Sequence, residues 1–502
     1  MDPLNLLIGG FSVALAPMNL LYCFMGVLIG TIVGVLPGLG PVAAMSLLLP
    51  VTFHTTPVAS IIMLAGIYYG AQYGGSTTAI LVNIPGEVAS IMTCLDGYQM
   101  ARQGRAGVAL GIAAFGSFIA GTLGVIGMML IAPPLADFAL KFGPPEFFSL
   151  MVLGMIILTF LTSTSMIRAL MMASFGLILG TIGLDNISNT PRFTFNITEL
   201  LDGVGLIPVA MGLFGISEVL LNIEVKVKRE VFTSNVTGLL PTLKDWGQSI
   251  WAILRGTFIG FFLGILPGGG AILGSFVSYA VEKRVSKHPE KFGTGVIEGV
   301  AAPESANNSG AQAAFIPLLT LGIPSNVVMA MLLGALMIHG VTPGPLLLVQ
   351  HPEIFLGLVA SMYVGNTLLL LLNLPLIGLW VKLLKVPYSF LFPLIIFFCL
   401  TGAYSINNSS TDVVIMLIFG GVGYFMRKLS LEAAPTVLAF VIGPLLENAL
   451  RLSLIKSNGS FSIFLTRPIS ATCLMVAFVL LTLSFFPRLR RPGAVLEKED
   501  IT

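Results

Sequence analysis

Two clusters of hydroxyl and amide side chains interrupt the apolar stretches of this chain, and they are its best candidates for binding chemistry. The first cluster, with its flanking residues, comprises Gly74, Gly75, Ser76, Thr77, Thr78 and Asn83. The second comprises Asn307, Asn308, Ser309 and Gln312, and Ser325 and Asn326 follow it. Neutral oxygens of this kind can replace the hydration shell of a monovalent cation. The clusters therefore predict an ion site, with Ser76, Thr77, Asn308 and Ser309 as candidate Na⁺ ligands.

The glycines before Ser76 suggest that a half-helix begins there. A helix N-terminus offers free N–H groups and a positive dipole end, which suit a carboxylate without an embedded Arg. The same interpretation makes Asn307 and Asn308 the counterpart in a second half-helix. The alternative is structural, since such side chains also cap helices or join them by hydrogen bonds.

Ionisable residues within or beside the apolar stretches are few: Glu87, Glu218, Arg255, Glu298, Glu304 and Glu447. Such residues are functional candidates, because burying a charge in lipid is costly. Glu304, in the sequence PESANNSG, is the best candidate for proton or cation coupling. The rest of the two clusters is neutral oxygen, so we expect Na⁺ rather than H⁺ as the coupling ion.

Three Gly/Pro-rich stretches are predicted to break helices at membrane depth: 37–40, 267–270 and 303–312. Free backbone groups cannot be satisfied by lipid, so broken backbone must be buried in protein or line a wet cavity. The residues placed at the paired breaks are Pro37, Gly38, Pro267, Gly268 and Gly269. An isolated break of this kind is more often a kink, but breaks at matching positions of a repeat favour a cavity.

Composition requires lipid as the main solvent. Of 502 residues, 56% are apolar and only 10% are charged, against roughly 25% charged in soluble domains. The net charge of +2 gives no basic field for nucleic acid. The sequence contains no P-loop, H-E-x-x-H or G-x-S-x-G motif, and we therefore expect no enzyme activity and no cofactor other than the coupling ion.

The chain repeats itself. The sequence GVLIGTIVGVLPGLG in the first half resembles GTFIGFFLGILPGGG 230 residues later. Further on, GAQ recurs after 240 residues, and IPG at Ile84 is matched by IPS at Ile323, 239 residues later. These matches predict two membrane repeats, 1–222 and 248–486, joined by a polar cytoplasmic linker, 223–247, and followed by a charged cytoplasmic tail, 487–502.

Loop charge predicts that the repeats are inverted. In the first half, Arg102 and Arg105 follow the GAQ segment, whereas in the second half Lys283 and Lys287 precede it. Short basic loops stay in the cytoplasm, so equivalent points of the repeats face opposite sides. Four spans between Arg105 and Lys226 place both of these on the cytoplasmic side. The predicted fold is an all-α polytopic membrane protein with two inverted-topology repeats and broken helices or re-entrant hairpins.

These motifs together resemble the large membrane subunit, or permease, of the tripartite tricarboxylate transporters. The resemblance rests on GVLPGLGP, YGGSTTAILVNIPGE, GILPGGGA, EGVAAPESANNSGAQ and LGIPSN, and it covers nearly the whole chain. It implies a permease of the bacterial inner membrane that imports citrate-like or other carboxylates by an ion gradient. It also implies two partners, a small four-helix membrane subunit and a periplasmic substrate-binding protein.

Alternatives remain at this point. A stand-alone secondary carboxylate carrier would have the same repeats but would need no soluble receptor. A channel would conduct without saturation, and an intramembrane enzyme would need a catalytic set such as paired Asp, which the sequence does not show. Paired breaks in inverted repeats favour the transporter over the channel and the enzyme.

Overall fold

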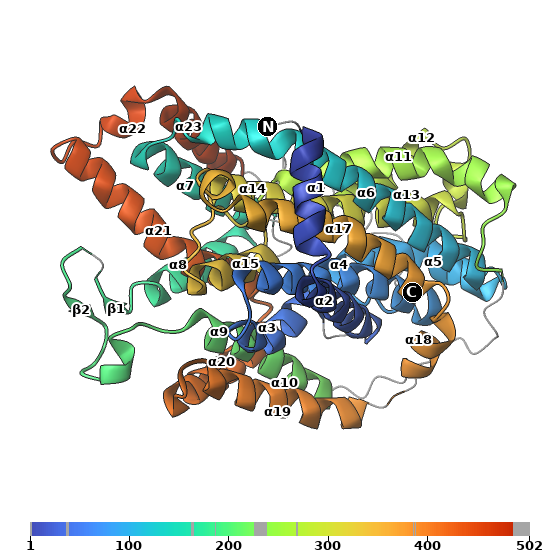
Figure 1. Cartoon of the computed structure of the whole chain (residues 1–502), viewed down its shortest axis with the longest axis horizontal. Coiled ribbons are helices and arrows are strands. Elements are labelled where there is room, and N and C mark those ends of the chain that lie inside the picture. The colour runs from blue at the N-terminus through green and yellow to red at the C-terminus, as the bar shows by residue number, and fades with distance from the viewer. Residues whose placement is uncertain are drawn as a thin grey trace. The chain divides into compact units, whose positions relative to one another are not determined.

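The computed structural model of the chain describes residues 3–36, 40–161, 165–185, 187–224, 238–267, 270–384, 386 and 388–484. Nearly all of this part is helical (Figure 1), with one antiparallel pair of two-residue strands, β1 (Gly183–Leu184) and β2 (Pro191–Arg192). Within it, seven segments are long and apolar enough to cross a membrane: Pro17–Val35, Ala106–Ala139, Leu206–Glu224, Leu243–Ile265, Pro352–Asn373, Ser410–Lys428 and Ala434–Lys456. The chain is a multi-pass, all-α membrane protein, as predicted.

The chain forms two compact units. Unit 1 is built from Met1–Leu140 and Val204–Leu429, and unit 2 from Lys141–Gly203 and Ser430–Thr502. Each unit thus combines two stretches that are distant in sequence. The predicted boundary at 223–247 separates the two sequence repeats, which is a different division from that into compact units. It stays a prediction.

Unit 1 contains most of the helices. In its first stretch these are α1 (Pro3–Ala14), α2 (Pro17–Val35), α3 (Gly40–Thr52), α4 (Pro57–Val82), η1 (Val88–Ser90), α5 (Ile91–Arg102) and α6 (Ala106–Ala139). Its second stretch begins with α9 (Leu206–Ala210), the π-helix η3 (Met211–Ile216), α10 (Ser217–Glu224), α11 (Leu243–Ile265), α12 (Gly270–Val285), η4 (Pro289–Lys291) and α13 (Glu298–Ala313). It continues with α14 (Phe315–Leu321), α15 (Val327–Ile338), α16 (Leu347–Gln350), α17 (Pro352–Asn373), α18 (Ile377–Leu383), α19 (Tyr388–Asn407) and α20 (Ser410–Lys428).

Unit 2 is smaller. Its elements are α7 (Pro144–Leu161), α8 (Met166–Leu179), strands β1 and β2, η2 (Thr198–Leu200), α21 (Ala434–Lys456), α22 (Ile463–Thr466) and α23 (Pro468–Ser484). Helix α8 packs closely on α21, since a Cβ at Gly176 would lie 2.1 Å from the Thr436 carbonyl oxygen. Small residues at such crossings let backbones approach in a medium that supplies no hydrophobic drive between helices.

In unit 1, α2 crosses α4 along three glycines spaced four residues apart. A Cβ at Gly26 would lie 2.3 Å from the Met63 carbonyl oxygen, and one at Gly34 would lie 2.3 Å from that of Ala71. No side chain fits at these distances, so the spacing of four keeps one glycine per turn on the crossing face.

The same crossing recurs between α11 and α13. A Cβ at Gly256 would lie 2.3 Å from the Ala302 carbonyl oxygen, and one at Gly264 would lie 2.5 Å from that of Gly310. The glycines follow Gly26 and Gly34 by 230 residues, whereas Ala302 and Gly310 follow Met63 and Ala71 by 239. The repeated packing supports a duplication with a longer connection in its second copy.

This packing corrects one detail of the repeat alignment. The GAQ motifs lie 240 residues apart, but in the helix crossings Gly310 takes the place of Ala71, not of Gly70. The left-handed residues that end α4 and α14, Asn83 (φ 58°) and Gly322 (φ 70°), also lie 239 residues apart. The inverted orientation of the two copies remains a prediction.

Two predicted breaks are wrong. Helix α4 runs without interruption from Pro57 to Val82, so Ser76 lies inside a helix and not at the start of one. Helix α13 likewise continues through Pro303 to Ala313. Their backbone N–H groups in this region are used within the helices, so they cannot bind a carboxylate as free helix N-termini. Pro303 is the sixth residue of α13, so it cannot donate to the Gly299 carbonyl oxygen, but membrane helices tolerate such a Pro where neighbouring groups satisfy the freed carbonyl.

The other breaks are present. Helix α2 ends at Val35 and α3 begins at Gly40, and α11 ends at Ile265 before α12 begins at Gly270. Of the residues placed at these breaks, Pro37, Gly38, Gly268 and Gly269 lie outside the described part, while Pro267 follows the end of α11. Two further breaks follow Asn83 and Gly322.

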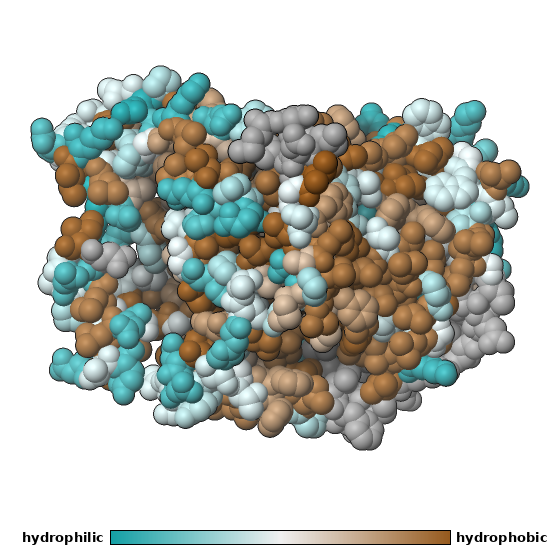
Figure 2. All heavy atoms as spheres, in the orientation of Figure 1, coloured by the Kyte–Doolittle hydropathy of each residue, from teal (hydrophilic) through white to brown (hydrophobic). Residues whose placement is uncertain are grey.

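Apolar side chains gather on the face of unit 1 that α2 and α17 present (Figure 2). On α2 the exposed large apolar residues are Met18, Leu20, Leu21, Phe24 and Met25. Such a surface suits lipid, since it would be too large an apolar patch for water. The opposite face of α2 carries the crossing glycines, so the helix separates a lipid side from a packing side.

Candidate functional site

A buried carboxylate lies where α4, α5 and α13 meet in unit 1. Glu304 of α13 has no exposed surface. One of its oxygens accepts a hydrogen bond from the hydroxyl of Ser76 on α4, and the other accepts one from the hydroxyl of Thr93 on α5. The Ser76 hydroxyl also lies 3.2 Å from the Gln72 carbonyl oxygen of its own helix, but its contact with the carboxylate is the shorter one. Glu304 thus joins three helices.

A second carboxylate lies one helical turn away along α13. Asn307 donates its side-chain amide to Glu87, with 2.9 Å between Nδ2 and Oε1. Glu87 follows the break after α4 and caps the start of η1. Because Asn307 comes three residues after Glu304, the two residues lie on neighbouring positions of one helix face. Helix α13 therefore carries the carboxylate of Glu304 and also holds that of Glu87, which comes from the first repeat.

The next residue, Asn308, reaches α6. Its Nδ2 lies 2.7 Å from the Ser117 hydroxyl oxygen and 3.0 Å from the Glu304 carbonyl oxygen. Asn308 is 2% exposed. We use the name polar centre for Ser76, Glu87, Thr93, Ser117, Glu304, Asn307 and Asn308.

A narrow pocket, partly open to the surface and with room for about one water molecule, adjoins the polar centre. Its polar lining residues are Tyr73, Ser76, Thr77, Ser117 and Asn373, and its apolar walls include Leu110 and Ile377. Asn308 does not line the pocket, but it is bonded to Ser117, which does. Its size and its few polar groups suit a water molecule or an ion, whereas a carboxylate substrate would need a wider space.

Helices α4 and α13, which supply most of the polar centre, also carry buried acceptors without a partner. Among the described residues these include the amide oxygens of Gln72, Asn307 and Gln312. An unsatisfied buried acceptor costs about 1–3 kcal/mol, so a ligand that supplies positive charge is favoured there. Neither α4 nor α13 contains a Lys or Arg.

Contacts between the repeats are reciprocal at one pair of positions. Asn307 donates to Glu87. With the offset of 239 residues, Asn307 is equivalent to Tyr68 and Glu87 is equivalent to Asn326. These two are also paired, with 3.4 Å between Asn326 Nδ2 and the Tyr68 hydroxyl oxygen. Reciprocal pairing of this kind is expected across a two-fold axis. Glu304 breaks the symmetry, because its equivalent in the first repeat is Ala65.

Several predicted site residues lie elsewhere. The Thr78 hydroxyl donates to the Val35 carbonyl oxygen at 2.7 Å, and that of Ser309 donates to the Thr257 carbonyl oxygen at 2.8 Å. Ser325 similarly donates to the carbonyl oxygen of Ala314. These hydroxyls join helices, which is the structural alternative considered from the sequence.

The remaining predicted residues have backbone roles. A Cβ at Gly74 would lie 2.4 Å from the Thr31 carbonyl oxygen, and one at Gly75 would lie 3.0 Å from Glu87 Cγ. Asn83 ends α4 in a left-handed conformation, and Asn326 caps α15 through the Met329 N–H. These positions shape the breaks beside the polar centre.

Sequence reasoning missed Thr93 and Ser117. Thr93 lies in the sequence IMTCLDGYQM and Ser117 in AAFGSFIAG, and neither stretch matches the other repeat or stands beside a break. Only the packing of α5 and α6 against α13 brings these hydroxyls to Glu304 and Asn308.

Comparison with known proteins gives a family and two relatives. A model of the tripartite tricarboxylate transporter TctA family matches residues 20–438. An Agrobacterium vitis protein described as an uncharacterized 52.8 kDa protein in the TAR-I ttuC' 3' region is 51% identical over 501 residues, covering 100% of both chains. Another, described as an uncharacterized protein in the TAR-II ttuC' 3' region, is 52% identical over 241 residues, which are 48% of this chain and 100% of that protein. No solved structure matches.

Proposed function

Since the chain belongs to the TctA family of tripartite tricarboxylate transporters, we propose that it imports tricarboxylates or related carboxylates as the permease of an ion-driven secondary transporter. The family supports a transporter subunit with partner subunits. The substrate within the carboxylate class, the coupling ion and the identity of the partners are our proposals.

One observation carries the ion coupling: the polar centre is rich in acceptors and lacks basic residues. Glu87 and Glu304 lie within it, and α4 and α13 carry no Lys or Arg. A carboxylate substrate bound beside the polar centre, once the narrow space there has widened, would add further negative charge. A bound cation offsets that repulsion, so that substrate and cation bind together and cross together.

We favour Na⁺ over H⁺ as this cation. A proton can be taken up by Glu87 or Glu304, but it does nothing for the buried amide oxygens of Gln72, Asn307 and Gln312, which have no partner in the described part of the chain. Amide oxygens, hydroxyls and a carboxylate are the ligands that hold a hard cation. Among the first candidate ligands, Ser76 and Thr77 line the pocket, whereas Ser309 is bonded to backbone.

We propose that the protein lies in the bacterial inner membrane and works with two partners. The first is a small four-helix membrane subunit. The second is a periplasmic substrate-binding protein that delivers the carboxylate. The word tripartite in the family description supports two further components, and the apolar segments support multi-pass insertion.

The test is uptake of radiolabelled citrate and other carboxylates into proteoliposomes holding the permease and its small subunit. We expect uptake with an imposed Na⁺ gradient after a protonophore has collapsed the proton gradient, and only when a purified candidate receptor is added outside. Uptake that persists without Na⁺ under a proton gradient, and vanishes under a Na⁺ gradient alone, would overturn Na⁺ coupling. Full uptake without any receptor would identify a stand-alone carrier instead.

A further inference from the structure

Residues 183–203 of unit 2, of which the structure describes all but 186, form a hairpin segment outside the helices. Four apolar segments separate Arg105 from Lys226: α6, α7, α8 and Leu206–Glu224. The hairpin segment lies between the third and the fourth of them. Both of those basic loops are assigned to the cytoplasm by their charge. Of the helices between Arg105 and the segment, α6 is long enough to cross by itself, while α7 and α8 are shorter apolar helices that cross, or turn back, as a pair. In both cases the number of crossings is odd, so we place the hairpin segment on the extracytoplasmic side.

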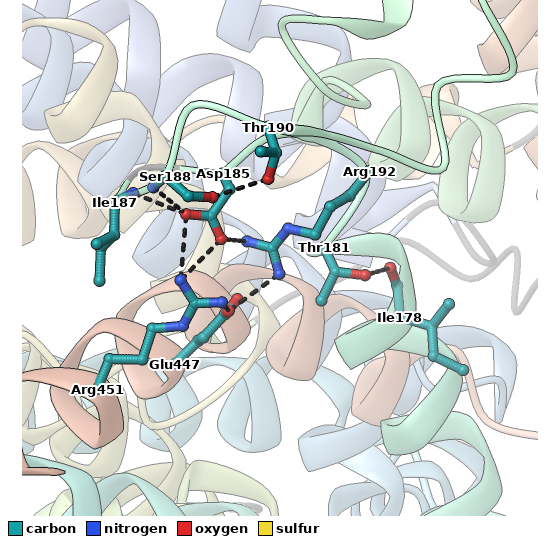
Figure 3. Close-up of polar contacts among 9 residues, drawn as sticks. All are labelled: Ile178, Thr181, Asp185, Ile187, Ser188, Thr190, Arg192, Glu447 and Arg451. Atoms are coloured by element: carbon teal, nitrogen blue, oxygen red, sulfur yellow. Dashed lines mark hydrogen bonds and ion pairs between the residues drawn. The ribbon is translucent and has the colours of Figure 1, made fainter. Parts of the chain in front are cut away.

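An ion-pair network fixes the base of the hairpin segment to α21 (Figure 3). Asp185 accepts hydrogen bonds from the Ser188 N–H at 2.6 Å and pairs with both Arg192 and Arg451, the latter at 2.8 Å. Glu447 completes the network by pairing with the same two arginines, at 2.9 Å and 2.7 Å. Each charge has two partners of opposite sign, so the base of the segment is held rigidly.

The far part of the segment displays apolar side chains to its surroundings. Phe193, Phe195 and Ile197 are 58%, 80% and 45% exposed, while Thr194 between the two aromatic residues is buried. Phe193 and Phe195 both adopt left-handed backbone conformations, with φ of 52° and 49°. That region is unfavourable for bulky side chains, and such strain clusters at binding and switch sites.

The charge of the segment decides between two partners for this apolar patch, a lipid surface and a protein. Residues 193–203 contain Glu199 and Asp202, both exposed, and no Lys or Arg. Acidic side chains beside an apolar tip are repelled by anionic lipid headgroups, and interfacial anchors are usually Trp or Tyr with basic neighbours. An apolar centre with a charged rim is instead the usual arrangement of a protein interface.

We propose that Phe193, Phe195 and Ile197, with Glu199 and Asp202 as their acidic rim, dock the soluble receptor of this transporter through an apolar cleft bordered by Lys or Arg. The inference rests on the proposed function, in which a receptor delivers the carboxylate from this side. The aromatic side chains bury apolar surface in the cleft, and the acidic rim steers the receptor onto them. The rigid base keeps the tip in position, so little freedom is lost on docking.

The experiment measures uptake into proteoliposomes against the concentration of the receptor that restores it. For Phe195→Ser we expect the half-saturating receptor concentration to rise at least tenfold, with the maximal rate little changed. Glu199→Lys combined with Asp202→Lys should raise it about tenfold at low salt and less at high salt, because salt screens the rim. Phe195→Tyr, which keeps the aromatic surface, should stay near the wild type. Leu243→Ser is the matched control, since Leu243 is 92% exposed on a different element.

Four results are decisive. Unchanged receptor dependence in both the Phe195→Ser variant and the charge-reversed variant overturns the docking surface alone. Uptake by the wild type without receptor overturns the proposed function instead. Emission of a Phe195→Trp variant that is quenched by brominated lipid in the absence of receptor shows a membrane contact and also overturns the proposal. Emission that shifts only when the receptor is added supports it.

Discussion

Glu304 gathers hydroxyl donors from two other helices, and this makes Ser76 a sensitive position. The side chain of Ser76 is 4% exposed and donates to the carboxylate across the α4–α13 contact. A hydrogen bond to a charged group contributes about 1.5–3 kcal/mol. We propose that the same carboxylate also binds the coupling ion. Loss of the Ser76 hydrogen bond should therefore affect uptake more than it affects the stability of the fold.

We therefore expect Ser76→Ala to lower Na⁺-driven uptake at least tenfold at low Na⁺ and to raise the half-saturating Na⁺ concentration. The measurement is initial uptake against external Na⁺. Ser249→Ala is the control, because Ser249 is also fully buried but donates to the Asp245 carbonyl oxygen of its own helix. Equal loss in both variants would mean that Ser76 acts only in packing.

Asp185 gives a pH-dependent prediction at the same scale. The hydrogen bond from the Ser188 N–H, aided by Arg192, lowers the pKa of Asp185 below its usual range. A carboxylate with a lowered pKa stabilises the folded state above the ordinary Asp pKa of about 3.9, and this contribution is lost as pH falls further. We expect Asp185→Asn to melt at a lower temperature than the wild type at pH 6, with the difference shrinking below about pH 4. A difference that is constant from pH 6 to pH 3 would contradict the assignment.

At the scale of elements, glycine spacing decides which helices cross. The glycines of α2 and α11 meet backbone carbonyls of α4 and α13 at distances that exclude any side chain. These crossings set the register of α13 against its neighbours, and thereby the position of Glu304. A helix pair that slipped by one residue would turn the carboxylate away from Ser76.

Gly256→Ala tests this packing, since the new Cβ would lie 2.3 Å from the Ala302 carbonyl oxygen. We expect a loss of about 1–3 kcal/mol of stability, as for other overpacked sites, seen as a lower melting temperature in detergent. Gly247→Ala on the same helix meets nothing within 4 Å. It should be neutral or slightly stabilising, because Ala is the better helix former. Similar melting temperatures for the two variants would show that the crossing tolerates a methyl group.

At the scale of the whole molecule, the question is how the two copies are oriented. The repeated crossings and the reciprocal pairs Asn307–Glu87 and Asn326–Tyr68 support a duplication related by a two-fold axis. The basic loops predict that this axis lies in the membrane plane, because they occupy opposite ends of the equivalent helices.

Single cysteines in a cysteine-free background test this orientation. Gln103→Cys and Lys287→Cys should react with a membrane-impermeant maleimide only from the cytoplasmic side, and Asn196→Cys only from the other side. All three positions are exposed in the structure. Labelling of positions 103 and 287 from opposite sides would refute the inverted repeat, and cytoplasmic labelling of position 196 would remove the basis of the docking surface.

The sequence by itself determined the membrane class, the internal duplication and Glu304 as a candidate for coupling. Hydropathy, glycine spacing and an isolated carboxylate are local properties, and lipid imposes strict rules on them. It misplaced the breaks at Ser76 and Pro303, because glycines and a single Pro occur in continuous membrane helices as well as in broken ones.

Only the tertiary structure decided which side chains meet Glu304. Thr93 and Ser117 lie on α5 and α6, far from the repeat motifs, and no local pattern marks them. Likewise Thr78 and Ser309 look like Ser76 and Asn308 in sequence but face neighbouring backbones. One residue along a helix turns a side chain by about 100°, so the difference between a ligand and a packing contact depends on helix register, which is set by contacts between segments distant in the chain.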